Sequence, residues 1–159
     1  MTTFGRYHEA LSLFDLALKI NPDNIEALSR KGIALIGMGR YNEAYSYFNQ
    51  YLKVNPCDAD VLNHTGSILN LQGKRKEAVE CFNKALDVHS YNSEILYNKA
   101  VTLFTMGKYT EAEETLKKIK PGTIGDSSKI LMETCLMQTN PDYSCTGIKL
   151  NTGSTKKNG

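Results

Sequence analysis

An internal repeat of 34 residues is the feature that most constrains how this chain folds. Displaced by that length, the sequence aligns with itself several times. The aligned columns are Gly5, Gly39, Gly73 and Gly107; Ala10, Ala44, Ala78 and Ala112; and Phe14, Phe48, Phe82 and Leu116. A period of this length is typical of an array of small stacked units, each of which contacts mainly its neighbours.

The sequence pattern of each 34-residue repeat predicts two helices. In residues 25–38, Leu28, Gly32 and Leu35 recur at intervals of four and three residues, as they would on one face of a helix. The segment 41–54 has the same periodicity. The glycine between two such segments permits the left-handed conformation in which helices commonly end. We therefore expect helix–turn–helix units and an all-α fold.

The small and aromatic columns predict how the helices pack. The small side chain of Ala44 lets two helix backbones approach closely, and Phe48 fills the adjacent gap. Asn-Pro pairs at 21–22 and 55–56 end the second helix of a unit, because the residue before a proline disfavours helical geometry.

These columns resemble the tetratricopeptide repeat family, whose 34-residue units have small, tyrosine, alanine, phenylalanine and proline landmarks. The matching residues are Gly32, Tyr41, Ala44, Phe48, Pro56, Gly66, Ala78, Phe82, Ala85, Tyr109 and Ala112. In three departures, leucine replaces the first-helix tryptophan in every unit, Arg75 replaces a tyrosine, and Tyr51 replaces a small residue. The resemblance covers residues 5 to about 120 and implies a right-handed helix–turn–helix solenoid, an α-α superhelix.

The repeat also predicts the domain organisation. A tetratricopeptide-like solenoid of about three and a half 34-residue repeats spans residues 5–138. Its parts are a half repeat at 5–24, repeats at 25–58, 59–92 and 93–120, and a C-terminal capping helix at about 126–138, which follows a helix-start signal at Asp126-Ser127-Ser128. Residues 139–159, in which Gly, Asn, Thr and Lys dominate, are expected to be a disordered tail.

The half repeat leaves one helix edge without a covering partner. Leu11, Phe14 and Leu18 are the side chains that we expect at this bare edge. Exposing three such side chains forgoes on the order of 5 kcal/mol, at ~1.5–3 kcal/mol each. Two explanations stay open. The chain is a fragment of a longer array, or the edge meets another chain and gives a homo-oligomer through the N-terminal half repeat.

Charge and composition exclude several classes of protein. Residues 1–138 carry 16 Lys and Arg against 16 Asp and Glu, so the net charge of +2 comes from residues 139–159. Without a basic field on the folded part, we expect no nucleic-acid binding. No apolar stretch reaches the length of a membrane span, and the N-terminus has no signal-peptide pattern. Four cysteines without disulfide-scaffold or zinc spacing favour a cytoplasmic protein.

No motif predicts catalysis or a metal site. His8, His64 and His89 occupy different places in the repeat and have no evident shared partner. The glutamate run at 111–114 lacks a second acidic cluster and is typical of a solvated helix face. We therefore expect a non-catalytic protein with no cofactor.

The resemblance implies a binding surface instead. In the tetratricopeptide repeat family, the first helices line a concave groove that holds a short peptide or a partner's helix. The groove positions correspond here to Glu26, Ser29, Arg30 and Ile33; to Asp60, Asn63, His64 and Ser67; and to Glu94, Tyr97, Asn98 and Val101. Asn63, His64, Tyr97 and Asn98 can pair with a peptide main chain, although simple solvation explains them equally well.

One groove column is acidic. Glu26, Asp60 and Glu94 recur at the repeat length near helix starts, either because they favour the helix dipole or because they form an acidic rim for a basic ligand. The clamp that some family members use for acidic chaperone tails is not expected, since Ser29, Ile33, His64, Glu94 and Asn98 stand at its positions and Glu94 would repel a carboxylate.

The sequence thus predicts a scaffold that binds a protein or peptide partner in its groove. Two alternatives are a regulatory or substrate-recruiting fragment of a larger multidomain enzyme, and a self-assembling structural piece that uses the uncapped N-terminal edge.

Overall fold

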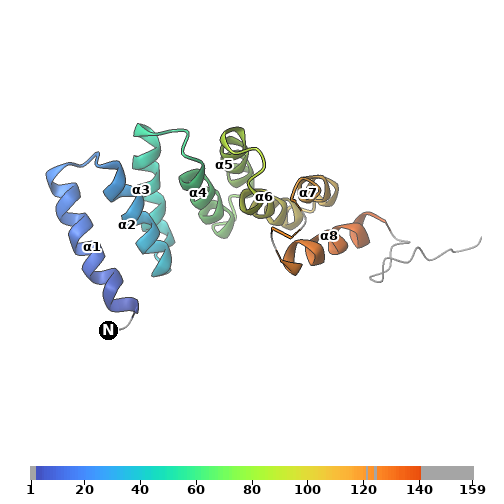
Figure 1. Ribbon diagram of the computed structural model, residues 1–159, viewed down its shortest axis with the longest axis horizontal. Coiled ribbons are helices and arrows are strands. Elements are labelled where there is room, and N and C mark those ends of the chain that lie inside the picture. The colour runs from blue at the N-terminus through green and yellow to red at the C-terminus, as the bar shows by residue number, and fades with distance from the viewer. Residues whose placement is uncertain (1–2, 121, 124, 141–159) are drawn as a thin grey trace, which may run out of the picture. The chain divides into compact units, whose positions relative to one another are not determined.

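The structure is a computed structural model that describes residues 3–120, 122–123 and 125–140. These residues form eight α-helices and no strand, which confirms the predicted all-α fold class (Figure 1). The chain divides into two compact units, an N-terminal unit, Met1–Ser90, and a C-terminal unit, Tyr91–Gly159.

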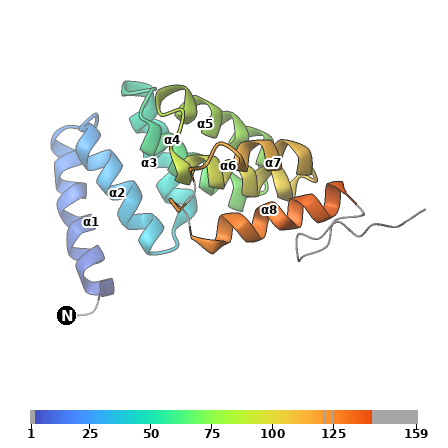
Figure 2. The same ribbon diagram turned by 45° about the vertical axis from the view of Figure 1, so that its right-hand side comes forward.

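The N-terminal unit is a row of helices in which each packs on the next (Figures 1 and 2). Its helices are α1 (Thr3–Ile20), α2 (Ile25–Gly37), α3 (Tyr41–Val54), α4 (Ala59–Leu71) and α5 (Arg75–Val88). Short loops join them, so neighbours in sequence are also neighbours in space.

Side-chain caps fix where the first helix of each 34-residue repeat begins. The Asn24 side chain accepts a hydrogen bond from the Ala27 backbone N–H at 3.0 Å and caps α2. Asp58 and Asn92 do the same for α4 and α6 (Ser93–Thr105), each by accepting from two backbone N–H groups. Such caps satisfy donors that the first helical turn leaves without a partner.

Glycine ends these same helices. Gly39, Gly73 and Gly107 have φ values of 72°, 79° and 75°, in the left-handed region where a side chain is disfavoured. After α2, the Arg40 N–H donates to the Leu35 carbonyl at 2.9 Å and the Gly39 N–H donates to the Ile36 carbonyl, which is the Schellman arrangement. Gly5 belongs to the same sequence column but lies inside α1, where the chain is already helical from Thr3.

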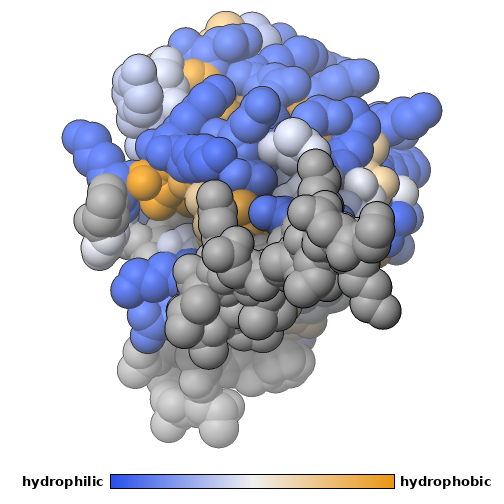
Figure 3. All heavy atoms as spheres, turned by 90° about the vertical axis from the view of Figure 1, so that its right-hand side faces the viewer, coloured by the Kyte–Doolittle hydropathy of each residue, from blue (hydrophilic) through white to orange (hydrophobic). Residues whose placement is uncertain are grey.

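The C-terminal unit consists of α6, α7 (Tyr109–Leu116) and α8 (Asp126–Thr139). α7 is short, and the chain tightens after it, where the Ile119 N–H donates to the Leu116 carbonyl three residues earlier at 3.0 Å. α8 packs on α7 and touches α6, and its Cys135 side chain is fully buried. In the coloured part of the space-filling view, small apolar patches lie among hydrophilic residues (Figure 3). The predicted tail lies outside the described residues from residue 141 onward.

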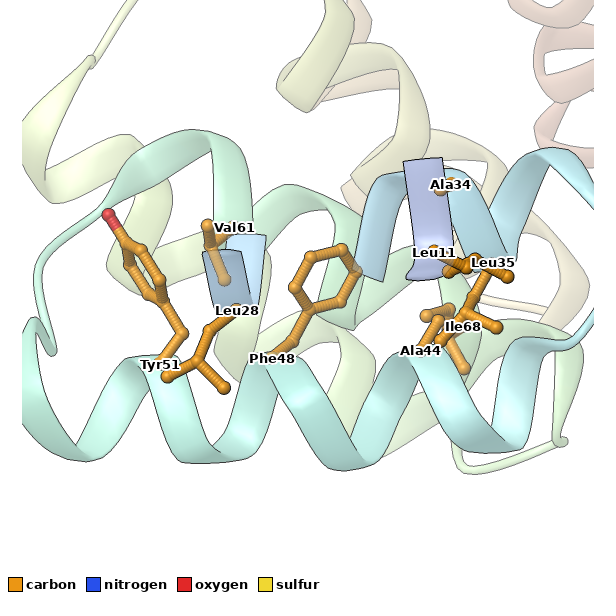
Figure 4. Close-up of a cluster of buried hydrophobic side chains, with 9 residues drawn as sticks. All are labelled: Leu11, Leu28, Ala34, Leu35, Ala44, Phe48, Tyr51, Val61 and Ile68. Atoms are coloured by element: carbon orange, nitrogen blue, oxygen red, sulfur yellow. The ribbon is translucent and has the colours of Figure 1, made fainter. Parts of the chain in front are cut away.

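The core of the N-terminal unit is built around Phe48. Its side chain is fully buried, and it rises from the same side of α3 as Tyr51 (Figure 4). A Cβ atom placed on Gly32 would collide with the Phe48 ring, and one placed on Gly66 would lie 2.8 Å from Cε1 of Phe82. Gly32 and Gly66 therefore admit the aromatic wedges, and Ala44, the small residue expected beside Phe48, is itself fully buried.

The exposed face of α1 differs from the one that we expected. Leu11 is buried at 7% exposure, and Phe14 and Leu18 are half-buried, because these side chains face the core shared with α2. The apolar stripe that α1 exposes is Leu13, Leu16 and Ile20, at 67%, 57% and 78% exposure.

Within the described part of the chain, no helix has the length and apolar character needed to cross a bilayer.

Candidate functional site

A surface pocket of about 430 Å³ lies on α2, and we call it the α2 pocket. Its lining residues are Ile25, Glu26, Ser29, Arg30 and Ile33 of α2 and Tyr51 of α3. Four of them, Glu26, Ser29, Arg30 and Ile33, are the groove positions expected in the first full repeat. Its volume falls within the range of roughly 300–1,000 Å³ that small binding sites have.

The α2 pocket combines apolar and charged surface. Ile25 and Ile33 are 41% and 47% exposed, which is unusually open for isoleucine in a packed array. Beside them, the Arg30 Nε donates to Glu26 Oε1 at 2.9 Å, and both side chains are mostly in solvent. An exposed pair of this kind is worth little by itself, so its groups can exchange partners at small cost.

Tyr51 is held at the wall of this pocket by two hydrogen bonds. Its side chain is buried, its hydroxyl donates to Asp58 Oδ2 at 2.6 Å, and it accepts from Asn55 Nδ2 at 3.2 Å. The other Asp58 oxygen, Oδ1, caps α4, so one carboxylate joins α3 to the start of the next helix. Burial, and then the hydrogen bond to Asp58, raise the pKa of Tyr51.

The groove positions of α4 lie outside the α2 pocket. Asp60 is exposed in the first helical turn, while Asn63 is buried at 6% exposure and Ser67 Oγ donates to the Asn63 carbonyl at 2.9 Å. The half-buried His64 ring stacks on Phe48, with centroids 5.7 Å apart and planes at 12°. α4 therefore offers His64 and Ser67 more readily than the buried Asn63 amide.

The groove positions of α6 belong to the C-terminal unit. Glu94 is exposed in the first turn, and Tyr97, Asn98 and Val101 are half-buried. The predicted positions are thus divided between the two units. Glu26, Asp60 and Glu94 each lie in the first turn of their helix, where a carboxylate favours the helix dipole.

The sequence does not predict an ion pair in which a buried lysine meets an exposed carboxylate. Lys31, only 8% exposed, donates from Nζ to Asp15 Oδ1 and to the Tyr47 hydroxyl, and it lies 4.2 Å from the centroid of the Tyr47 ring. Burial alone would lower the pKa of Lys31, but the hydrogen bonds with Asp15 and Tyr47 outweigh it and raise this pKa. The cluster joins α1, α2 and α3. Its one sequence signal is a lysine in the apolar first helix, with partners sixteen residues away on either side.

Within the residues that the structure describes, no group of three His, Cys, Asp or Glu side chains is placed to hold a metal ion. Three cysteines are free thiols: Cys57 is exposed, Cys81 half-buried and Cys135 buried. Burial raises the pKa of both Cys81 and Cys135, which disfavours the reactive thiolate.

The sequence model of the tetratricopeptide repeat family matches residues 2–63 and 69–123, which is more than half of the chain. The chain belongs to the tetratricopeptide repeat family. Members of this family are generally non-catalytic interaction scaffolds. No curated protein matches this tetratricopeptide repeat chain in sequence.

Solved structures show the same fold. The MamA protein is 20% identical, with a TM-score of 0.80, over 85% of this chain and 74% of that one. A MamA fragment (41-end) from Desulfovibrio magneticus RS-1 is 23% identical, with a TM-score of 0.68, over 72% of this chain and 64% of that one. YrrB is described as a tetratricopeptide repeat protein with an unusual peptide-binding site. It is 17% identical, with a TM-score of 0.71, over 80% of this chain and 66% of that one. At these identities the likeness is one of fold.

Proposed function

We propose that this tetratricopeptide repeat chain is a non-catalytic scaffold that binds a peptide or helix of a partner protein, with the α2 pocket as its central contact. The observation that carries the proposal is the coincidence of this pocket with four expected groove positions. The description of YrrB as a peptide-binding member of the same fold supports it.

The chemistry of the pocket suits a peptide with an apolar anchor. The exposed methyl groups of Ile25 and Ile33 gain hydrophobic contact when a bulky side chain covers them. The Glu26–Arg30 pair can then hydrogen-bond the peptide main chain at the edge of the contact. Because Tyr51 is already fixed by Asp58, binding costs no further ordering of this side chain.

A selection of displayed twelve-residue peptides on the purified chain tests this proposal. Bound peptides should lose about tenfold or more in affinity when Ile33→Asp places a carboxylate in the α2 pocket. The matched control is Leu71→Asp, which changes an apolar side chain of the same unit that is 66% exposed and lies outside the pocket. Peptides that lose affinity equally with both variants, or with neither, would place the binding surface elsewhere.

We propose that the groove positions of α4, in the same unit as the pocket, extend this contact, and that those of α6 form a contact of their own in the C-terminal unit. His64 and Ser67 are partly exposed in the N-terminal unit, and Tyr97, Asn98 and Val101 are partly exposed in the C-terminal unit, so each set can touch a peptide. Tyr97→Ala should weaken peptides that bind at α6 by several-fold and leave those that need the α2 pocket unaffected, as fluorescence anisotropy would show. Asn63 is a poor choice for such a test because its substitution would disturb packing as well as binding.

The exposed stripe on α1 favours a second candidate function, self-association through that helix. Leu13, Leu16 and Ile20 are separated by three and four residues, so they form one apolar line on the helix. If copies of the chain meet there, light scattering will show dimers that Leu16→Glu converts to monomers. A wild-type chain that stays monomeric at high concentration would contradict this function.

We also infer a cytoplasmic location, because Cys57 is a free and exposed thiol that suits a reducing compartment. A tagged copy of the protein that is recovered from an oxidising compartment would contradict this.

A further inference from the structure

The C-terminal unit contains a second pocket, of about 420 Å³, between α7 and α8; we call it the α7–α8 pocket. It shares no lining residue with the α2 pocket. Its apolar part consists of Leu116 and Ile119 on one side and Met132 and Leu136 on the other. Of these four, only Leu116 is buried, whereas the others are half-buried and open to solvent.

The charged edge of this pocket is mainly basic. Lys117, Lys120 and Lys129 line it, against the single carboxylate of Glu133. Lys117 is engaged by Glu113 at 2.6 Å, and Lys129 lies 3.6 Å from Asp126, with both partners of the latter pair mostly in solvent. The Lys129–Asp126 pair is long and hydrated, so Lys129 can turn to another carboxylate at small cost. Lys120 and Lys129 are therefore the cations that can meet a ligand.

We propose that the α7–α8 pocket is a second binding site, which takes a short peptide segment with bulky apolar side chains next to carboxylates. The apolar side chains cover Ile119, Met132 and Leu136, and the carboxylates meet Lys120 and Lys129. This goes beyond the proposed function, which concerns the α2 pocket in the other unit.

Two features favour a peptide over other occupants. The apolar floor is half-open, which suits two or three side chains lying on a surface, whereas an acyl chain would need a closed, fully buried lining. The chain's own residues 141–159 carry Lys149, Lys156 and Lys157 against Asp142, so their net charge has the same sign as the lysine edge and is repelled by it. A partner segment with acidic residues is complementary to it.

The test uses fluorescence anisotropy of the full chain with three amidated, dye-labelled pentapeptides. The first is Glu-Leu-Phe-Leu-Glu, the second replaces both glutamates with lysine, and the third replaces the three apolar residues with serine. We expect only the first to bind below millimolar concentration, and we expect added salt to weaken it. Equal binding of the lysine peptide, or no binding of the glutamate peptide at millimolar concentration, would overturn the proposal.

Two variants locate the site. Lys120→Glu combined with Lys129→Glu should weaken the glutamate peptide by about tenfold or more. The control pair, Lys84→Glu with Lys118→Glu, makes the same change in net charge at exposed lysines that do not line the pocket. Met132→Gln should also weaken binding, since it removes apolar contact from a half-buried side chain. An unchanged affinity for the glutamate peptide in the Lys120→Glu, Lys129→Glu variant would overturn the proposal.

Two further measurements separate this inference from other outcomes. Ile33→Asp, which disrupts the α2 pocket, should leave the affinity of the glutamate peptide unchanged, so the two sites can fail independently. In the free protein, nuclear Overhauser contacts from Ile148 or Leu150 to the Met132 methyl would show that the chain's own tail fills the α7–α8 pocket. That result would overturn the assignment to a partner.

Discussion

At the residue scale, one aromatic side chain carries much of the N-terminal packing. Phe48 is fully buried between α2, α3 and α4, where Gly32 leaves room for its ring and His64 stacks on it. The sequence predicts this wedge because the aromatic and small columns recur together. It does not predict that His64 covers the ring, because a polar side chain in a first helix gives no signal of stacking.

Phe48→Ala should therefore lower the free energy of unfolding by about 3–5 kcal/mol, since it leaves a cavity that the surrounding helices fill only in part. Urea denaturation followed by circular dichroism measures this. Leu71→Ala, at a position 66% exposed, is the control and should change stability by less than about 1 kcal/mol. Similar losses in the two variants would mean that Phe48 is not the wedge described.

The hydrogen-bonded side chains of Tyr51 and Lys31 predict that the folded state loses stability at alkaline pH. The pKa values of Tyr51 and Lys31 are raised above their ordinary values of 10.0 and 10.5, so the folded state holds both protons more tightly than the unfolded state. Their contribution is fully present below pH 10.0 and is lost as pH rises through the raised values. Urea midpoints should fall above pH 10.0 and fall less in Tyr51→Phe. Tyr91→Phe, at an exposed tyrosine, should keep the wild-type slope, and an identical slope in Tyr51→Phe would refute the prediction.

At the scale of elements, the helices follow closely from local sequence. Caps such as Asn24 and the glycine turn at Gly39 are short-range signals, so the predicted segment 41–54 coincides with α3. The early end of α7 and the pocket beside α8 were not predicted, because they depend on contacts between helices that no period encodes. For the same reason, the exposed stripe of α1 was assigned to the wrong residues.

The docking of α8 predicts an order of thiol reactivity. In a Cys145→Ser background, which removes a thiol outside the described residues, Cys57 should react fastest with a disulfide reagent, Cys81 more slowly and Cys135 slowest. Burial hides the last two and raises their pKa values. Mass spectrometry of the labelled peptides gives the rates. Labelling of Cys135 as fast as Cys57 would mean that α8 does not stay packed on α7.

At the scale of the whole molecule, charge balance limits the kinds of partner. Residues 1–138 are neutral overall, so a nucleic acid would release few counterions on binding. We expect no binding of a labelled 20-base-pair duplex at physiological salt, up to a protein concentration of about 10⁻⁴ M. This concentration equals the dissociation constant of weak non-specific DNA binding. A salt-sensitive rise in fluorescence anisotropy below that concentration would refute this expectation.

The glycine turns have a stereochemical consequence. At Gly39, Gly73 and Gly107 the backbone is left-handed, yet a Cβ atom there would meet nothing within 4 Å. An L side chain is therefore disfavoured there by its handedness and not by crowding, and a D-amino acid has the handedness that this backbone prefers. A chemically synthesised chain with D-alanine at these joints should keep the fold and gain about 0.4–1 kcal/mol per site, because fewer conformations remain open to the unfolded chain. Among the residues that ribosomal synthesis supplies, the achiral glycine is therefore the one that these left-handed turns favour most.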